Sequence, residues 1–340
     1  MATEVNRSAE QCADGLARRR VGRTEVALTE LGFGTSRLGN LYAAIDDDTA
    51  AAAVDAAWDA GIRYFDTAPH YGLGLAERRL GKALADRPRD ELVVSTKVGR
   101  LLEPNPRPTG SDLEAGGFDT GDDLVRRFDY SRDGVRRSLE TSLERLGLDR
   151  VDVVLVHDPD DFVDEAVRSA VPALVELRDE GVVGAVGVGM NQWEAPLRIV
   201  RETDVDVVML AGRWTLLDRT GAPLLEACAG RGVSVLDAGP FNSGVLAMPW
   251  PEEGATFDYS PADEGLLARA QALATVCRRH DIPLPAAALR FPLRSDVVAS
   301  VVAGMGTAQE VRSNVEWLAT EVPEAVWADL ERTRPGASLP

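Results

Sequence analysis

Short apolar segments alternate with helical patterns along most of this 340-residue chain. The segment at 153–156 has the unbroken hydrophobicity that is typical of a strand covered on both faces. The stretch at 131–146 instead carries apolar residues at helical spacing, with Ser131 placed as an N-cap and Gly147 as a stop. About eight such strands occur without an intervening linker. This alternation permits either a doubly wound sheet or a closed (β/α)8 barrel.

Polar residues at the ends of successive strands favour the barrel. Asp66, Lys97, His157 and Asn191 follow the second, third, fourth and fifth predicted strands. Only ring closure brings the ends of all four strands to one mouth. We therefore predict a single (β/α)8 TIM-barrel domain over 1–340. Within it we expect an N-terminal β-hairpin in 19–34, a flexible tail at about 1–18 and a long, functional polar loop at 98–130.

Charge and cysteine content narrow the function. The net charge of -18 disfavours nucleic acid and anionic membrane surfaces as partners. Cys12, Cys228 and Cys277 lie far apart without a CxxC pair, so neither a disulfide framework nor a metal site is predicted. No leader-like or membrane-spanning apolar stretch occurs, and we expect a cytoplasmic protein that acts on a small molecule, as a monomer or homodimer.

Four residues near the predicted barrel mouth indicate proton transfer. Lys97 is one of only two lysines among 37 basic residues, and it ends a strand-like run. A buried ammonium needs a carboxylate partner or a chemical role, and it would favour the phenolate of Tyr71. Asp66 could orient Lys97, and His157 could align a substrate oxygen. The alternative is structural: Asp66 caps a turn and Tyr71 is a half-buried aromatic. Redox chemistry at such a site would require a cofactor.

These motifs resemble the aldo-keto reductase superfamily over about residues 25–320. DTAPHYG, STKVG and LVHDPD match the family's catalytic motifs in order and spacing. The resemblance implies catalytic roles for Asp66, Tyr71, Lys97 and His157, and implies that Asn191 in GVGMN holds the nicotinamide carboxamide. GAVGVG could also suggest a dinucleotide-binding sheet, but no glycine completes GxGxxG.

The resemblance also suggests where the rest of the cofactor binds. Ala211 replaces a common glutamine in AGRWTLL, and a stacking tyrosine is missing from DAGPFNSGVL, so Arg213 and Trp214 could contribute instead. In AGMGTAQEVRSN, Gly304 and Glu310 stand where positive charges would hold the 2'-phosphate of NADP. NAD is therefore expected to be preferred over NADP, with Arg312 left open as a phosphate ligand. The remaining expected cofactor residues are Asn242, Ser243, Gly244, Gly306 and Asn314.

Within the family, the variant motifs resemble the subgroup that oxidises sugars at C1. The expected reaction is oxidation of an aldose to its lactone, with Trp193, Trp214 and the 98–130 loop forming the pocket wall. Rim packing is an equal alternative for both tryptophans. Pyridoxal 4-dehydrogenation and broad NADPH-dependent carbonyl reduction are enzymatic alternatives. A nucleotide-binding regulatory subunit is the non-enzymatic one.

Overall fold

The computed structural model of the protein describes residues 15–333. Of the expected flexible tail at 1–18, residues 1–14 lie outside the described part. Arg18 already belongs to the first strand, so the tail prediction is wrong at that residue.

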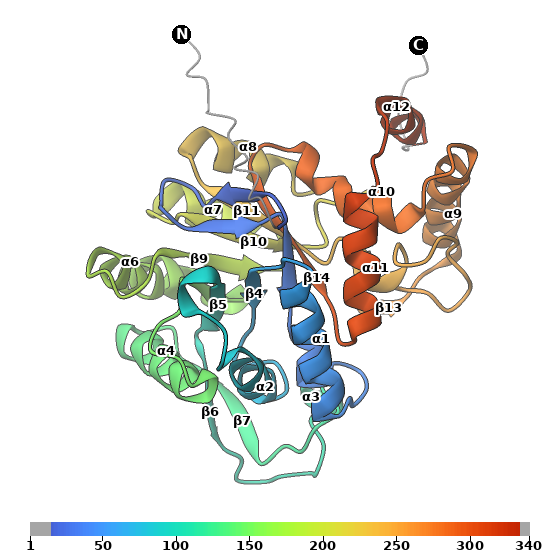
Figure 1. The fold of residues 1–340 in the computed structure, drawn as a ribbon. Coiled ribbons are helices and arrows are strands. Elements are labelled where there is room, and N and C mark those ends of the chain that lie inside the picture. The colour runs from blue at the N-terminus through green and yellow to red at the C-terminus, as the bar shows by residue number, and fades with distance from the viewer. Residues whose placement is uncertain (1–14, 334–340) are drawn as a thin grey trace.

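Eight parallel strands close into a barrel, as predicted (Figure 1). β14 pairs with β3, with Ala303 opposite Phe33, and this pairing completes the ring. In ring order the strands are β3 (Leu31–Gly34), β4 (Tyr64–Asp66), β5 (Val93–Val98), β8 (Val153–His157), β9 (Ala185–Met190), β10 (Val207–Ala211), β11 (Ser234–Ala238) and β14 (Val298–Gly304).

Helices surround the barrel and end where local sequence signals place them. Ser131 caps α4 by accepting a hydrogen bond from the Gly134 N–H at 3.1 Å, and Gly147 ends it in a left-handed conformation. A short 3-10 and α-helical segment and a π-helical turn, Ala166–Ala170, lead into α6. The surrounding helices are α1 (Asp47–Asp59), α2 (Leu75–Leu84), α4 (Arg132–Leu146), α6 (Val171–Asp179), α7 (Glu194–Glu202), α8 (Ala222–Arg231), α9 (Glu264–Arg279), α10 (Leu284–Arg290), α11 (Ala308–Ala319) and α12 (Glu324–Arg332).

The 98–130 segment is not the irregular loop that we expected. β6 (Arg100–Pro104) and β7 (Leu124–Phe128) pair as antiparallel strands, with the short α3 (Leu113–Gly116) between them. We call residues 100–128 the hairpin arm, and it extends past α2 and α4 at the lower edge of Figure 1. Apolar and polar residues alternate only weakly along these two strands, and several of the residues are charged. Because a long segment separates the strands, the local sequence gives little indication that they pair.

The N-terminal hairpin closes the end of the barrel opposite the strands' carboxyl ends. Its strands are β1 (Arg18–Arg20) and β2 (Ala27–Thr29), which confirms the predicted hairpin. Val21 and Leu28 are fully buried and join the cluster of side chains inside the barrel. The Gly22 N–H also donates to Ser234 Oγ at 2.7 Å, at the first residue of β11. The hairpin therefore acts as the barrel floor.

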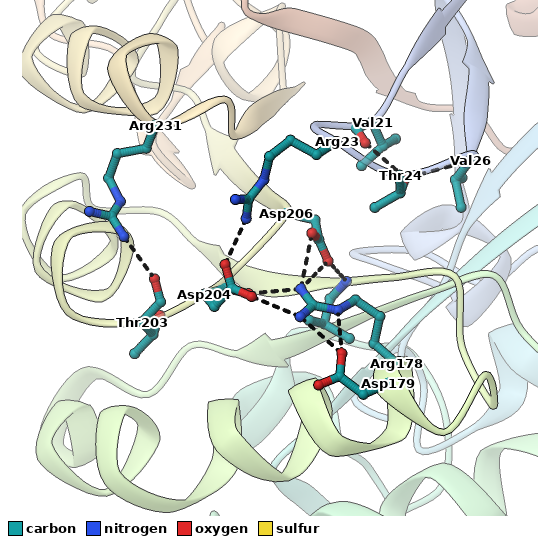
Figure 2. Close-up of polar contacts among 11 residues, drawn as sticks. Val21, Arg23, Thr24, Val26, Arg178, Asp179, Thr203, Asp204, Asp206 and Arg231 are labelled. Carbon is teal, nitrogen blue, oxygen red and sulfur yellow. Dashed lines mark hydrogen bonds and ion pairs between the residues drawn. The ribbon is translucent and has the colours of Figure 1, made fainter.

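Ion pairs tie this floor to the surrounding helices (Figure 2). Arg178 of α6 binds Asp179, Asp204 and the buried Asp206, and Arg23 of the hairpin reaches Asp204 at 2.6 Å. A cleft of about 870 Å³ lies at this end, lined by these side chains. Because the charges of this network are paired with one another, we regard it as structural.

Candidate active site

Three of the four predicted catalytic residues lie at carboxyl ends of barrel strands. Asp66 is the last residue of β4, Lys97 is the penultimate residue of β5, and His157 is the last residue of β8. Tyr71 follows in the loop between β4 and α2. The barrel places all four at one mouth, and the carboxyl ends of the strands are where barrel enzymes carry out chemistry.

Lys97 connects the acid and the phenol. Its Nζ lies 2.7 Å from Asp66 Oδ2 and 3.1 Å from Tyr71 OH, and it also donates to the Thr67 carbonyl at 3.0 Å. The Lys97 and Asp66 side chains are only 2% and 3% exposed. Ser95 Oγ donates to the other oxygen of Asp66 at 2.7 Å. A buried charge pair that is satisfied in this way holds the ammonium in a fixed position.

Burial and neighbouring charges have opposite effects on the pKa values of Lys97 and Tyr71. Burial lowers the pKa of Lys97, but the attraction of Asp66 and Tyr71 outweighs it, so that the pKa lies above the ordinary lysine value. Burial raises the pKa of the Tyr71 phenol, and the Lys97 ammonium opposes this rise without cancelling it. Lys97 therefore stays charged and makes the Tyr71 phenolate more accessible than burial alone would allow.

His157 is a neutral imidazole beside the phenol. Its ring centroid lies 5.9 Å from that of Tyr71, edge to face. Burial lowers the pKa of His157 well below its ordinary value, and the positive charges of Arg100 and Lys97 lower it further. A neutral imidazole here can hydrogen-bond a substrate oxygen without adding a charge.

Several residues at the mouth were not predicted as site residues. The His70 ring lies 5.6 Å from that of His157 and 5.2 Å from that of Phe118. Burial lowers the pKa of His70 to about 2, with nearby Arg100 and Arg126 adding to the effect. The sequence signal for His70 was its place in the PHY triplet, whereas Phe118 and Arg126 reach the site only through the fold of the hairpin arm.

The hairpin arm is attached to the catalytic loop. Arg126 donates to the His70 carbonyl at 2.9 Å while it holds Asp112 at 2.6 Å. Phe118 also forms an isolated antiparallel bridge with Leu41. The arm thus contacts the loop that carries Tyr71, and the functional role expected of the segment at 98–130 stays a prediction.

Residues after β9 and β14 offer a place for a dinucleotide. Asn191 directly follows β9 and is half-buried. Gly304 ends β14, and a side chain at Gly306 would come within 2.9 Å of Arg37 Cβ. Asn314 of α11 is 3% exposed, and its Oδ1 has no hydrogen-bond partner among the described residues. Glycine backbone and an available amide oxygen fit a nicotinamide dinucleotide.

Other expected contact residues have bonds within the protein. Asn242 donates to the Gly212 carbonyl at 3.0 Å and accepts from Thr215 Oγ1 at 2.6 Å, so it also stabilises its own turn. Arg213 forms ion pairs with Asp218 and Asp258. In the next loop, Ser243 Oγ accepts a hydrogen bond from the Tyr259 N–H. Gly244 follows it with a φ of 118°.

The two expected pocket tryptophans are partly buried against the core. Trp214 lies 5.5 Å from Phe291 between ring centroids, and Trp193 packs against the main core cluster at the start of α7. No contact described for either tryptophan joins it to Tyr71 or His157. Their roles in substrate binding stay predictions, and rim packing accounts for the contacts observed.

Comparison with known proteins places this geometry in a family. The profile of the Aldo/keto reductase family matches residues 30–334. The chain belongs to the aldo/keto reductase family. This confirms the resemblance drawn from the sequence, and aldo/keto reductases use nicotinamide cofactors, NADH or NADPH. The chain is thus an oxidoreductase, and the cofactor would supply the hydride acceptor or donor that its own side chains lack.

Individual family members are similar over nearly the whole chain. A D-threo-aldose 1-dehydrogenase from a Pseudomonas species is 48% identical, covering 91% of this chain and 95% of its own length. A pyridoxal 4-dehydrogenase from Microbacterium luteolum is 38% identical over 92% and 96%. A solved aldo-keto reductase from Bacillus halodurans, in its holo form, aligns with a TM-score of 0.73 and 27% identity, over 95% and 97% of the two chains.

Across residues 15–333, no helix is both long and apolar enough to span a membrane. In that same part of the chain, no cluster of three or more His, Cys, Asp or Glu side chains is placed to hold a metal ion.

Proposed function

We propose that this aldo/keto reductase oxidises an aldose at its anomeric carbon, giving a lactone, and prefers NAD to NADP. The observation that carries the proposal is an intact Asp66–Lys97–Tyr71 group beside His157 in a chain similar to a D-threo-aldose 1-dehydrogenase. A non-enzymatic regulatory subunit would not require a buried ammonium held at the phenol.

The chain's own groups supply the proton chemistry. In the oxidative direction the Tyr71 phenolate takes the proton of the C1 hydroxyl, and Lys97 stabilises that phenolate from 3.1 Å. His157 hydrogen-bonds the same oxygen through its imidazole. Asp66 holds Lys97 in place. A nicotinamide cofactor, when bound, would supply the hydride acceptor for C1.

The preference for NAD rests on the start of α11. The Glu310 carboxylate accepts hydrogen bonds from the Gly306 N–H at 2.6 Å and the Thr307 N–H at 3.2 Å, which completes a capping box. Negative charge thus already occupies the backbone donors at this helix start. A 2'-phosphate near them would meet repulsion. Asn191, Gly304, Gly306 and Asn314 are the residues that we propose to hold the dinucleotide, with Arg213, Asn242, Ser243 and Gly244 beside it.

A substrate panel tests the proposal. Formation of NADH from NAD, or of NADPH from NADP, is measured with L-fucose, D-arabinose, L-galactose and pyridoxal, and aldehyde reduction is measured with NADH and with NADPH. We expect an aldose with NAD to give the highest kcat/KM. If pyridoxal is turned over far better than every sugar, the pyridoxal 4-dehydrogenase alternative replaces the aldose proposal. If only aldehyde reduction with NADPH is seen, the enzyme is a carbonyl reductase instead.

A further inference from the structure

Arg100, at the start of the hairpin arm, and Tyr130, two residues after its end, contact the dipeptide His157–Asp158. At one end, Arg100 donates to Asp158 Oδ2 at 2.6 Å. Just beyond the other end, the Tyr130 hydroxyl lies 2.8 Å from the His157 carbonyl and 2.9 Å from the Asp158 carbonyl. Gly99 has a φ of 102°, and a side chain there would collide with the Tyr130 ring, so glycine permits this close packing. Arg100 therefore holds the Asp158 carboxylate, and Tyr130 holds the backbone carbonyls of both residues.

The backbone conformation of Asp158 turns its carboxylate back toward the imidazole. Asp158 has a φ of 38°, in the left-handed region that non-glycine residues seldom adopt, and its N–H donates to the Gly189 carbonyl at 3.0 Å. Its Oδ2 lies 3.4 Å from His157 Nε2. His157 Nδ1 is buried and has no hydrogen-bond partner among the described residues. The carboxylate thus faces one ring nitrogen only.

We propose that Asp158, held by Arg100, is a positioning residue that keeps the proton of neutral His157 on Nε2. A neutral imidazole carries one proton, and an adjacent carboxylate favours the tautomer whose N–H points at it. The inference rests on the proposed function, because there His157 hydrogen-bonds the oxygen of the substrate. Asp158 would determine which ring nitrogen carries the proton before the substrate binds. Arg100 would offset the negative charge of the carboxylate, so that the imidazole does not take up a second proton.

The charges facing His157 explain the role of Arg100. Positive groups come from Arg100 of β6, Lys97 of β5 and Arg126 of β7, and a second imidazole from His70. Asp158 is the negative group at the ring, and Tyr71 is the neighbouring phenol. Without Arg100, less positive charge would oppose the charge of Asp158 at the imidazole, with burial, Lys97 and Arg126 still acting against it. The pKa of His157 would then rise toward its ordinary value.

Nuclear magnetic resonance tests this directly, because the chain has only three histidines. Long-range proton–nitrogen spectra of the full-length protein report the tautomer of each ring, and His70→Asn and His157→Asn variants assign the signals. We expect the Nε2–H tautomer at His157 in the wild type and a mixture of tautomers in Asp158→Asn. A wild-type Nδ1–H tautomer, or an unchanged spectrum in Asp158→Asn, would overturn the proposal.

A charge cycle tests the part played by Arg100. In Arg100→Gln we expect the pKa of His157, followed by the same spectra, to rise by about one unit or more, and Arg100→Gln/Asp158→Asn should reverse the rise. Arg127→Gln is the matched control, since Arg127 lies on the same arm and pairs with Glu103. A rise of equal size in the control, or one that survives the double substitution, would refute the role of Arg100.

Kinetics connect the tautomer to turnover. Asp158→Asn should lower kcat with the best substrate about tenfold, because general acid–base groups contribute about 10²–10⁴-fold only when correctly placed. An unchanged kcat alongside a changed tautomer would contradict a positioning role. If His157→Asn itself leaves kcat unaltered, the proposed function of His157 fails, whereas the spectra still decide whether Asp158 sets the tautomer.

Discussion

At the scale of single residues, two opposing effects set the pKa of Tyr71. Burial raises the pKa of its phenol, and the ammonium of Lys97 opposes that rise from 3.1 Å. The balance matters because oxidation needs the phenolate and reduction needs the phenol. Lys97 in turn keeps its proton because Asp66 lies 2.7 Å away. Changes to each partner should therefore have separate kinetic signatures.

Removal of the phenol hydroxyl should abolish proton transfer while leaving the fold intact. We expect Tyr71→Phe to lower kcat by about 10²–10⁴-fold, the usual contribution of a general acid–base group, with cofactor affinity largely retained. Steady-state rates and cofactor titration by fluorescence measure the two quantities. Tyr42→Phe is the control, because Tyr42 is 50% exposed. Near-normal turnover in Tyr71→Phe would show that Tyr71 is not the proton acceptor.

Removal of the ammonium should move the pH dependence. Oxidation rises with pH as Tyr71 loses its proton, so a further rise in its pKa shifts this limb to higher pH. In Lys97→Met the opposing charge is gone and Asp66 raises the pKa of Tyr71 further, so we expect the kcat/KM limb to move toward alkaline pH. Asp66→Asn/Lys97→Met should recover part of the shift. A limb that stays in place would argue against tuning of the phenol by Lys97.

At the scale of elements, two acidic residues have separate consequences. At the start of α11, Glu310 caps the helix by accepting from two backbone N–H groups. On β11, Asp237 is fully buried, and neither carboxylate oxygen has a hydrogen-bond partner within residues 15–333. Its neighbours across the sheet are Leu210 and Val301. We expect Glu310 to affect cofactor choice and Asp237 to affect stability.

Neutralising Glu310 should weaken discrimination against NADP. Glutamine can keep the capping box because its amide oxygen still accepts from the helix start. We therefore expect Glu310→Gln to raise the NADP-to-NAD ratio of kcat/KM roughly fivefold, the effect of removing about 1 kcal/mol of repulsion. Glu316→Gln, an exposed position on the same helix, controls for net charge. A ratio that does not change, or changes equally in both variants, would exclude Glu310 as the determinant.

The buried carboxyl of Asp237 should make stability depend on pH. Burial raises its pKa well above the ordinary value, so the folded state keeps a proton that the unfolded state releases. The stability linked to this proton is therefore complete below the unfolded pKa and is lost as pH rises from there to the raised folded pKa. We expect the Tm of Asp237→Asn, relative to the wild type, to increase between about pH 4 and pH 8. The exposed Asp296→Asn should show no such trend, and a flat difference for Asp237→Asn would contradict burial of an unpaired acid.

At the scale of the whole molecule, the barrel separates chemistry from stability. The tetrad and the hairpin arm occupy the carboxyl ends of the strands, whereas the N-terminal hairpin and the ion pairs of Arg178 with Asp204 and Asp206 close the other end. The strand termini converge on the mouth, so residues far apart in the chain assemble there.

The catalytic residues could be predicted from the sequence, whereas the residues of the hairpin arm that reach the mouth could not. Asp66, Lys97 and His157 end apolar strands, so the alternating pattern and motif spacing were enough to place them at one mouth. Arg100 and Phe118 reach that mouth only because β6 and β7 pair across an intervening segment, and local propensity says little about such pairing. The hydrogen bond that Asn242 accepts from Thr215 likewise joins two different loops, so it could not be predicted from the sequence around Asn242. The helix α12 follows the last expected element and was not predicted.

Transfer of deuterium from C1 of an aldose tests the central claim most directly. The best sugar from the substrate panel is prepared with deuterium at C1 and oxidised with NAD, and the products are analysed by mass spectrometry. The proposed reaction predicts deuterium in the reduced cofactor, a lactone without deuterium, and loss of both products in Tyr71→Phe. Unlabelled reduced cofactor, or a product oxidised at another carbon, would contradict it.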